Sequence, residues 1–479
     1  MNCMDLWAII PEMILAGFGL CLVPVAGLSK GRGQNVVVFL AVSGLIAAAV
    51  FSVPMLSWQD QAVFCGTYAV DGFSTVFKLL ILLGALLSLF TIGAHFRGTG
   101  KEGHAAVALL FSTLGGVLAA SSLDLGLIVL FLQLLSMASY ILVALVRTDR
   151  EANEAALKYF IYGAVALAVM AYGLSFLYGL TGSLSLPAIG AGLKGADGVW
   201  VALAFGLVLI GYAFEITAVP FHFWAPDVYT GASAPVTGFL SVVPKLAGFA
   251  ALLRFLLVAL PGGLAAWPLA MAILAALTMT LGNLVALRQT RLKRLLAYSS
   301  IAQAGYVLMA VAVSERVPDA LSAAGYYLLA YLLMNSGAFV VASQLERLTG
   351  SDELRGLRGL GQRSPLAALG LTLSLLSLAG IPPLAGFAGK ILLLDVTLSG
   401  GLTWLAVVAV LNFAVALYYY LLPTAEIYLR SPNTSQRLPN QAGYLLALGL
   451  SVFGTLVIGV LPNTALTLTE QLSRLFGGR

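Results

Sequence analysis

Long apolar stretches separated by short polar segments run from one end of the sequence to the other. A membrane-spanning helix needs about 20 mostly apolar residues, and the pattern predicts fourteen such segments. They cover residues 6–28, 35–56, 72–94, 104–122, 124–146, 155–180, 199–229, 236–258, 264–287, 294–313, 320–345, 364–397, 402–428 and 441–467. The connections are mostly too short to fold independently. The sequence therefore predicts an all-α polytopic membrane protein.

Prolines interrupt two of these segments near their middle. Pro220 follows Glu215 in the seventh segment, and Pro382 and Pro383 precede Lys390 in the twelfth. Proline removes a backbone hydrogen bond and clashes with the preceding turn, so both segments are expected to be broken helices. Lipid cannot satisfy the freed backbone groups, which must face protein or trapped water. A pair of such breaks is typical of the ion path of a repeat-built transporter.

The composition supports a membrane protein without a redox centre of its own. Hydrophobic residues make up 60% of the chain, charged residues 9%, and the mean hydropathy is +0.98; soluble domains are far more polar. The 3 cysteines show no paired spacing, and the 3 histidines are scattered. Iron–sulfur and haem sites need clustered thiolates or placed axial ligands. We therefore expect no cofactor or metal on this chain.

The positive charges are divided unevenly between the two faces of the membrane. With an even number of spans, seventeen of the 25 Lys and Arg residues fall in loops or helix ends on one face, and four on the other. Cytoplasmic loops are rich in Lys and Arg. The richer face is therefore predicted to be cytoplasmic, with both termini on the outer, periplasmic side. The net charge of +5 reflects this topology, and we expect no nucleic acid as a partner.

A few ionisable side chains fall at membrane depth, where an ionised group costs on the order of 3 kcal/mol or more. Glu215 and Lys245 lie well inside the seventh and eighth segments, and Lys390 follows the second break. Because burial makes the charged form of a lysine less stable, such groups suit a proton relay. A static ion pair between Glu215 and Lys245 is the structural alternative.

Three other charged residues are weaker candidates for a functional role. Arg254, at the end of the eighth segment, is expected to extend toward the membrane surface. For Lys78, six residues into the third segment, a functional role and an interfacial position both stay open. Asp124 opens the fifth segment and is expected to stabilise the positive helix N-terminus.

Uncharged polar groups lie between these ionisable residues. They could carry protons through water or could simply join helices by hydrogen bonds, and both readings stay open. These groups are Gln133, Ser136, Ser139 and Tyr140 in the fifth segment, His222 at the first break, and Tyr298, Ser299, Ser300 and Gln303 in the tenth.

Several of these segments match a known family. The runs LKYF (157–160), AVPFHFWAPDVY (218–229), LAYSSIAQ (296–303), LMNSGAF (333–339) and SLAGIPP (377–383) resemble the antiporter-like membrane subunits of bacterial respiratory complex I. The resemblance is strongest to the subunit nearest the quinone-reducing arm and covers nearly the whole chain. It implies two inverted five-helix repeats, broken at the seventh and twelfth helices. The implied parts are three N-terminal helices (1–102), a first repeat (103–260), a second repeat (261–430) and a last helix (431–479).

The resemblance also implies roles for single residues, with three departures. In the family, a fifth-helix glutamate pairs with a seventh-helix lysine, and lysines of the eighth and twelfth helices follow. Lys245 and Lys390 match these last two. The glutamate position is Gln133, the seventh-helix lysine position is Glu215, and a tenth-helix position often held by histidine is Gln303. Either Glu215 pairs with Lys245 instead, or the channel is impaired while assembly is retained.

The implied function is that of a proton-translocating subunit of an NADH:quinone oxidoreductase in the bacterial inner membrane. NADH, flavin, iron–sulfur clusters and quinone would be bound by partner subunits, and this chain would meet quinone only at an interface. Protons would pass Glu215 and Lys245, cross near residues 298–303 and leave at Lys390. Two alternatives stay open: a subunit of a multisubunit cation/proton antiporter or membrane-bound hydrogenase, and a structural complex I subunit with an impaired channel.

Overall fold

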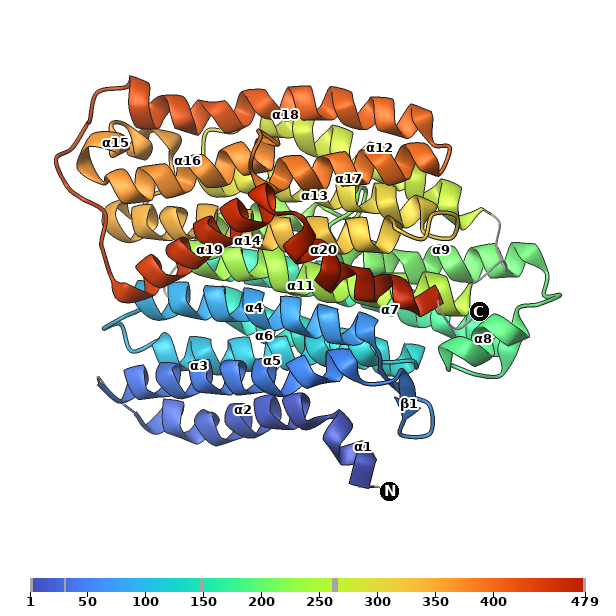
Figure 1. Ribbon diagram of the computed structural model, residues 1–479. Coiled ribbons are helices and arrows are strands. Elements are labelled where there is room, and N and C mark those ends of the chain that lie inside the picture. Colours follow the sequence, from blue (N-terminus) through green and yellow to red (C-terminus); the bar gives the residue numbers. More distant parts are fainter. Residues whose placement is uncertain (1–2, 30–31, 147–149, 261–265, 477–479) are drawn as a thin grey trace.

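Long, roughly parallel helices form almost the whole protein in the computed structural model, which describes residues 3–29, 32–146, 150–260 and 266–476 (Figure 1). Thirteen helices in these ranges are long and apolar enough to span a membrane. They are α2 (Ile10–Leu28), α3 (Arg32–Ser52), α4 (Gly72–His95), α5 (Glu102–Ser121), α6 (Leu125–Val143), α7 (Arg150–Thr181), α9 (Gly198–Glu215), α11 (Ala234–Arg254), α12 (Trp267–Ala286), α13 (Leu292–Val313), α14 (Ala320–Thr349), α18 (Thr403–Leu429) and α19 (Ala442–Val460).

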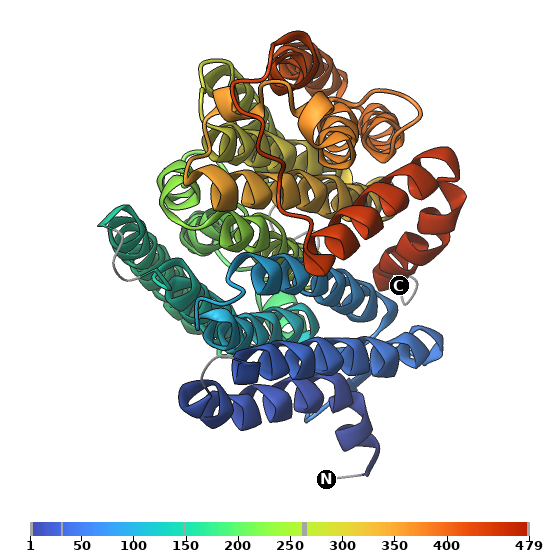
Figure 2. The same ribbon diagram turned by 90° about the vertical axis from the view of Figure 1, so that its left-hand side faces the viewer.

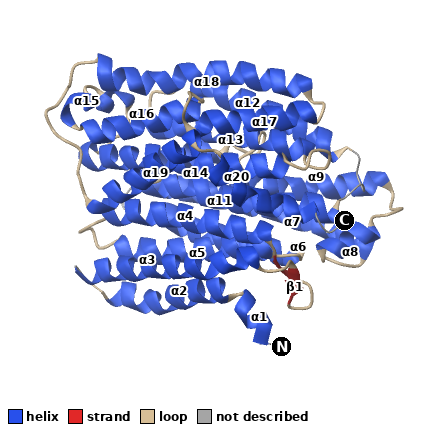
Figure 3. Ribbon diagram, in the orientation of Figure 1, coloured by secondary structure: helices blue, strands red, loops and turns tan. Residues whose placement is uncertain are grey.

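Shorter elements connect or extend these helices. They are α1 (Cys3–Ala8), η1 (Val53–Ser57), α8 (Leu186–Gly192), α10 (Trp224–Gly231), the π-helical η2 (Phe255–Ala259), η3 (Leu354–Leu357), α15 (Leu360–Arg363), α16 (Pro365–Ala379), α17 (Ala385–Ser399), α20 (Asn463–Thr469) and η4 (Glu470–Phe476). A small antiparallel hairpin of β1 (Gln61–Val63) and β2 (Tyr68–Val70), drawn red in Figure 3, was not expected from the sequence.

The predicted fourteen spans agree with the structure once α16 and α17 are taken as two halves of one span. Each half has 15 residues, which is too short to cross a membrane alone. Two of the predicted spans were too long at one end. The first span begins at Ile10 because the chain is interrupted at Ile9, and the last ends at Val460 because Leu461 and Pro462 interrupt it before α20.

Both predicted helix breaks are present. The first separates α9 from α10, and the second separates α16 from α17; each contains a cis peptide bond, at Val219–Pro220 and at Pro382–Pro383. Freed backbone groups at the first break find protein partners. The Trp224 indole donates to the Phe214 carbonyl at 3.2 Å, and the Val219 amide donates to Thr278 Oγ1 at 3.1 Å. The expectation that these groups face protein is confirmed.

The two halves of the bundle repeat the same pattern of neighbouring helices. In the first half α5 packs on α6 and α11, and α7 packs on α9 and α10. In the second half α12 packs on α13 and α18, and α14 packs on α16 and α17. An odd number of spans per unit reverses the direction of the second unit. This pattern is what two inverted five-helix repeats require, while their boundaries at residues 102, 260 and 430 stay a prediction.

Lys78 is buried in an ion pair, which excludes the interfacial position that the sequence left open. Its Nζ atom lies 2.9 Å from Glu12 Oε1 and donates to the Tyr68 hydroxyl at 2.9 Å. Tyr68 in turn donates to the same Glu12 oxygen at 2.6 Å. The cluster joins α2, β2 and α4. Lys78 therefore lies outside the candidate path described below.

Arg254 is also buried, at the end of its helix, so it is an ion-paired side chain and not an exposed anchor. Its guanidinium donates to both Asp71 carboxylate oxygens, at 2.8 and 3.0 Å. Asp71 also caps α4 by accepting from the Ser74 amide. Burial by itself raises the pKa of Asp71, but the charge and hydrogen bonds of Arg254 lower the pKa below its ordinary value. Paired in this way, both charges can be buried. Asp124 caps α6 through the Leu127 amide, as expected.

Candidate functional site: a buried polar path

Lys245 lies at the centre of the bundle, on a helix whose every residue is buried. Its Nζ atom donates to two atoms of Ser300 on α13, the backbone carbonyl and the hydroxyl, both at 2.5 Å. The Ser300 hydroxyl lies 2.7 Å from the Tyr331 hydroxyl of α14. Tyr331 donates to the Ser241 carbonyl at 3.0 Å, back on α11. The ammonium group is thus held by oxygen atoms of α13 rather than by a carboxylate.

Neighbouring residues of α13 carry the path further through the second repeat. Ser299 Oγ lies 2.5 Å from the Tyr420 hydroxyl of α18. Gln303 Nε2 donates to the same hydroxyl at 2.9 Å, and the Gln303 side-chain carbonyl accepts from the Tyr327 hydroxyl of α14. Gln303 Nε2 also reaches the Leu378 carbonyl at 3.4 Å. Gln303 therefore connects α13 to three other helices, α14, α16 and α18.

Lys390 occupies the second helix break. Its Nζ atom donates to the Leu378 carbonyl at 2.9 Å and to the Ala379 carbonyl at 2.8 Å, two groups freed where α16 ends. The same atom lies 4.5 Å from the ring centre of Phe413 and 5.4 Å from that of Tyr306, within the range of cation–π attraction. The broken helix thus creates the binding site for the lysine.

Gly380 makes room for Lys390 at this break. It has a φ of +88°, which glycine adopts without steric cost. A Cβ atom at this position would meet Lys390 Cδ at 2.8 Å. The residue that ends α16 therefore also shapes the pocket of the lysine.

These contacts form one polar path across the protein, because Gln303 and Lys390 share the Leu378 carbonyl as an acceptor and Ser299 and Ser300 are adjacent. From the first repeat to the second, it runs through Lys245, Ser300, Ser299, Tyr420, Gln303, the Leu378 carbonyl and Lys390. Every side chain in it is buried. We call this set the central path.

Glu215 and Gln133 line a separate cavity. Both line an empty space of about 300 Å³ between α6, α7 and α9, together with Ser136. The Ser136 hydroxyl donates to Glu215 Oε2 at 3.4 Å, while Glu215 Oε1 is buried without a hydrogen-bond partner. Among the described residues no cation forms an ion pair with Glu215. The cavity therefore holds a buried carboxylate with no lysine paired to it among the described residues.

The alternative in which Glu215 pairs with Lys245 is wrong for this structure. The Glu215 side chain packs against Gly248, one turn beyond Lys245 on α11; a Cβ atom there would lie 2.9 Å from Glu215 Cγ. The two residues are therefore neighbours, but Lys245 points at Ser300 on α13. The Glu215 side chain is too short to reach the Lys245 ammonium group at that position.

The remaining predicted relay residues differ in their placement. His222 is buried at the first break, where its Nδ1 atom has no partner in the described chain. Tyr298 is partly buried and its hydroxyl takes no part in the central path. Tyr327, Tyr331 and Tyr420 were missed as relay residues. Tyr420 had a signal, since it ends a run of three tyrosines (418–420) in an apolar helix.

The described residues contain no group of three or more His, Cys, Asp or Glu side chains that could hold a metal ion. The polar side chains of this site are two lysines, a carboxylate, hydroxyl groups and an amide, which can donate or accept protons.

The comparisons with known proteins identify the family. Residues 122–415 match the family described as NADH:quinone oxidoreductase/Mrp antiporter, TM. NADH-quinone oxidoreductase subunit N of Chlorobium chlorochromatii is 41% identical over 88% of this chain and 85% of that protein. Subunit N of an Anaeromyxobacter species is 40% identical over 98% of this chain and 96% of that protein.

Solved structures of similar proteins support the same family assignment. A chain of respiratory complex I from Thermus thermophilus superposes with a TM-score of 0.82 and 38% identity, covering 96% of this chain and 99% of that one. A chain of the Mrp complex from Dietzia superposes with a TM-score of 0.86 at 25% identity, covering 98% and 97%. Both subunit N relatives are more similar in sequence to this chain than the Mrp chain is. This multi-pass membrane protein therefore belongs to the subunit N family of NADH-quinone oxidoreductases.

Proposed function

We propose that this chain is a membrane subunit of a proton-translocating NADH:quinone oxidoreductase and that the central path conducts protons. The proposal rests on two groups of buried hydrogen bonds, one around Lys245 and one reaching Lys390, which the adjacent residues Ser300 and Ser299 of α13 bring together. Burying two lysines at membrane depth is expensive, and both are held by neutral oxygen atoms rather than by carboxylates. Such a lysine can give up its proton without leaving an unpaired carboxylate behind.

The proposed direction of transfer is from the first repeat to the second. Protons from the cytoplasmic side would reach Glu215 and Lys245, cross through the side chains on α13 and leave at Lys390 toward the outer side. The link to electron transfer would be electrostatic. A change of charge near one lysine alters the proton affinity of the next, and such coupling acts in both directions.

The partners and location belong to the same proposal. Names of the relatives and the complex I structure support assembly with other complex I membrane subunits and, through them, with a peripheral arm. We propose that NADH, flavin, iron–sulfur clusters and quinone are bound there and not by this chain. The protein would reside in the bacterial inner membrane, with its Lys- and Arg-rich loops in the cytoplasm and both termini outside.

Purification through an affinity tag on this chain tests the assignment. We expect flavin-bearing and quinone-reducing subunits to copurify, and the preparation to reduce quinone with NADH. An untagged strain carried through the same steps is the control. Recovery of the chain only with the subunits of a cation/proton antiporter, or with a hydrogenase, would contradict the proposal.

A structural subunit with an impaired channel is the second candidate, and the lone Glu215 carboxylate is the observation that favours it. In this candidate, the residues that would admit protons to the first repeat, at Gln133 and Glu215, differ from those of the family, while the central path is intact. Both residues, which match the family's glutamate and lysine positions, line this cavity.

Exchanging both residues should therefore be tolerated better than changing one. The single variant Glu215→Lys buries an unpaired cation, which costs roughly 3–5 kcal/mol, and should lower the amount of assembled complex. Adding Gln133→Glu supplies the missing carboxylate, so Gln133→Glu/Glu215→Lys should restore assembly and proton pumping to at least the wild-type level. Assembly is measured on native gels and pumping in vesicles. A double variant as poor as the single one would show that these positions do not face each other.

A further inference from the structure

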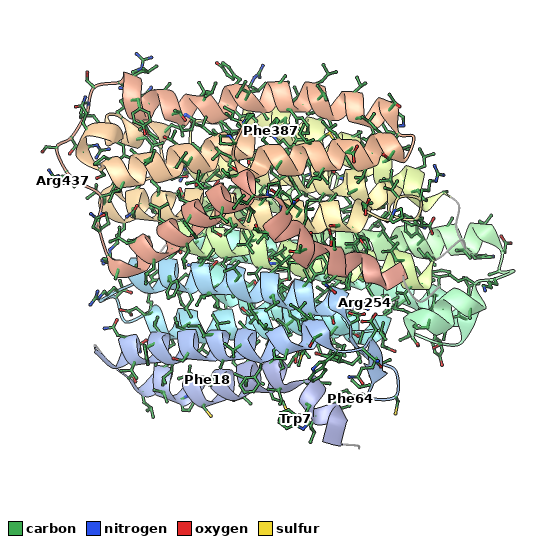
Figure 4. The ribbon with its side chains drawn as sticks, in the orientation of Figure 1. Trp7, Phe18, Phe64, Arg254, Phe387 and Arg437 are labelled. Carbon is green, nitrogen blue, oxygen red and sulfur yellow. The ribbon has the colours of Figure 1, made fainter. Side chains whose placement is uncertain are left out.

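An open cleft lies at the end of the bundle where the arginine-rich loops meet. It holds about 1190 Å³ of empty space and is formed by the α12–α13 connection, by the segment leading into η3 and by the last turns of α18. Figure 2 views this end, with the loop that follows α18 crossing the face toward α19. In Figure 4 Arg437, on that loop, marks the same end, and Arg254 lies toward the opposite one.

The walls of the cleft are fixed to one another. The Leu354 amide donates to the Thr290 carbonyl at 3.0 Å, which joins the η3 segment to the α12–α13 connection. Arg358 donates to Glu426 Oε2 at 2.8 Å, which joins the η3 segment to α18. Three stretches far apart in the sequence thus form one preorganised site.

Arg288, Arg355 and Arg430 line this cleft, one from each wall, and all three are exposed. None of them forms an ion pair or a side-chain hydrogen bond within the described chain. Neighbouring arginines on the same face differ. Arg291 pairs with Asp352 and Arg294 pairs with Asp227. The three cleft arginines are therefore a group of uncompensated charges.

The acidic residues of the cleft do not neutralise this group. Glu426 is already paired with Arg358, and Glu353 is a single exposed carboxylate against three guanidinium groups. The cleft keeps an excess of positive charge. This excess suits an anion that can contact several arginines at once, as phosphate groups do.

Apolar residues in and beside the cleft indicate what kind of molecule carries the anionic group. Leu422 lines the cleft, α18 presents exposed Leu421 next to it in sequence, and α12 presents exposed Leu284 one turn before Arg288. These residues belong to the ends of two membrane spans. A ligand with its charge among the arginines would therefore have its apolar part along lipid-facing helices.

We propose that this cleft binds the headgroup of an anionic phospholipid, with phosphate oxygens on Arg288, Arg355 and Arg430 and acyl chains along α12 and α18. Basic pockets between membrane helices at the cytoplasmic surface suit such headgroups. A lipid is favoured over a protein partner because exposed leucines at the ends of two membrane spans lie near the cleft arginines in sequence. The proposal does not depend on proton conduction by the central path.

Lipid binding by the purified complex tests the proposal. The complex would be delipidated in mild detergent and titrated with cardiolipin or phosphatidylglycerol in phosphatidylcholine nanodiscs, with bound lipid measured by mass spectrometry. We expect the triple variant Arg288→Gln/Arg355→Gln/Arg430→Gln to bind these lipids about 100-fold more weakly, since each arginine near an anionic lipid surface contributes about 1 kcal/mol. Arg97→Gln/Lys101→Gln/Arg150→Gln removes the same charge from the same face and should bind like the wild type.

Three results would overturn the proposal. The first is equal weakening in the two triple variants, which would indicate a general charge effect. The second is competition by inorganic phosphate at the same concentration as lipid phosphate, which would indicate a soluble anion. The third comes from a photoreactive residue at the exposed Thr290 position in the assembled complex. Crosslinking there should capture phospholipid, and capture of a partner subunit instead would show that protein occupies the cleft.

Discussion

Replacing Lys390 by methionine should stop proton transfer through the second half of the central path while leaving the complex assembled. Methionine is unbranched and of similar length, so it fills the same space without a proton to exchange. The Leu378 and Ala379 carbonyls would lose their common donor. Removing a proton-transferring group slows its step by about 100-fold or more. Proton uptake or release coupled to NADH oxidation should therefore fall to background in membrane vesicles.

The controls for this variant separate the loss of a proton carrier from the loss of a fold. Lys194→Met makes the same replacement at an exposed position and should leave pumping unchanged. The amount of assembled complex, measured on native gels, should be the same for both variants. Wild-type pumping by an assembled Lys390→Met complex would remove Lys390 from the proposed function.

The sequence predicted the architecture well because membrane proteins obey strong local rules. Apolar length and proline position are properties of single segments, and they located the spans and both breaks around Pro220 and Pro382. The ends of spans were less certain. Residues 461–467 continue the apolar pattern of α19, and only the structure shows that the helix stops at Val460. The β-hairpin was missed because strands of three residues leave no periodic signal.

The candidate site could be predicted only in part, because hydrogen-bond partners come from different helices. Lys245 and Lys390 were recognisable as charges at membrane depth. Their acceptors were not, since the Ser300 and Leu378 carbonyls are backbone groups that every residue has. Tyr331 and Tyr420 come from α14 and α18, and no spacing within either helix shows that they meet α13.

Charge pairing was the least predictable feature. Arg254 looked like a surface-seeking residue because its partner, Asp71, is 183 positions away in the sequence. The pairing of Glu215 with Lys245 looked reasonable from charge alone, but the direction of each side chain decides it. Lys245 points at α13, and Glu215 stays in the cavity with Gln133.

Gln303 should be the residue on which continuity of the central path depends most. It bonds Tyr420 and Tyr327 and shares the Leu378 carbonyl with Lys390. The variant Gln303→Leu keeps the approximate volume but removes every polar atom, and it leaves a buried hydroxyl unpaired at a cost of about 1–3 kcal/mol. The variant Gln303→His keeps a donor and an acceptor, and it introduces the residue that the family often carries there.

The two variants should therefore assemble alike and conduct differently. Proton transfer across the Gln303 step should slow by about 100-fold or more in Gln303→Leu, while Gln303→His should stay near the wild-type rate. A defect of equal size in both would indicate that packing around residue 303, rather than proton transfer, had been disturbed.

The number of protons translocated per NADH oxidised, compared between Gln303→Leu and Gln303→His in vesicles with equal amounts of assembled complex, tests the central path most directly. The ratio should fall in the leucine variant and stay at the wild-type value in the histidine variant. A leucine variant that pumps as many protons per NADH as the wild type would contradict conduction between Lys245 and Lys390.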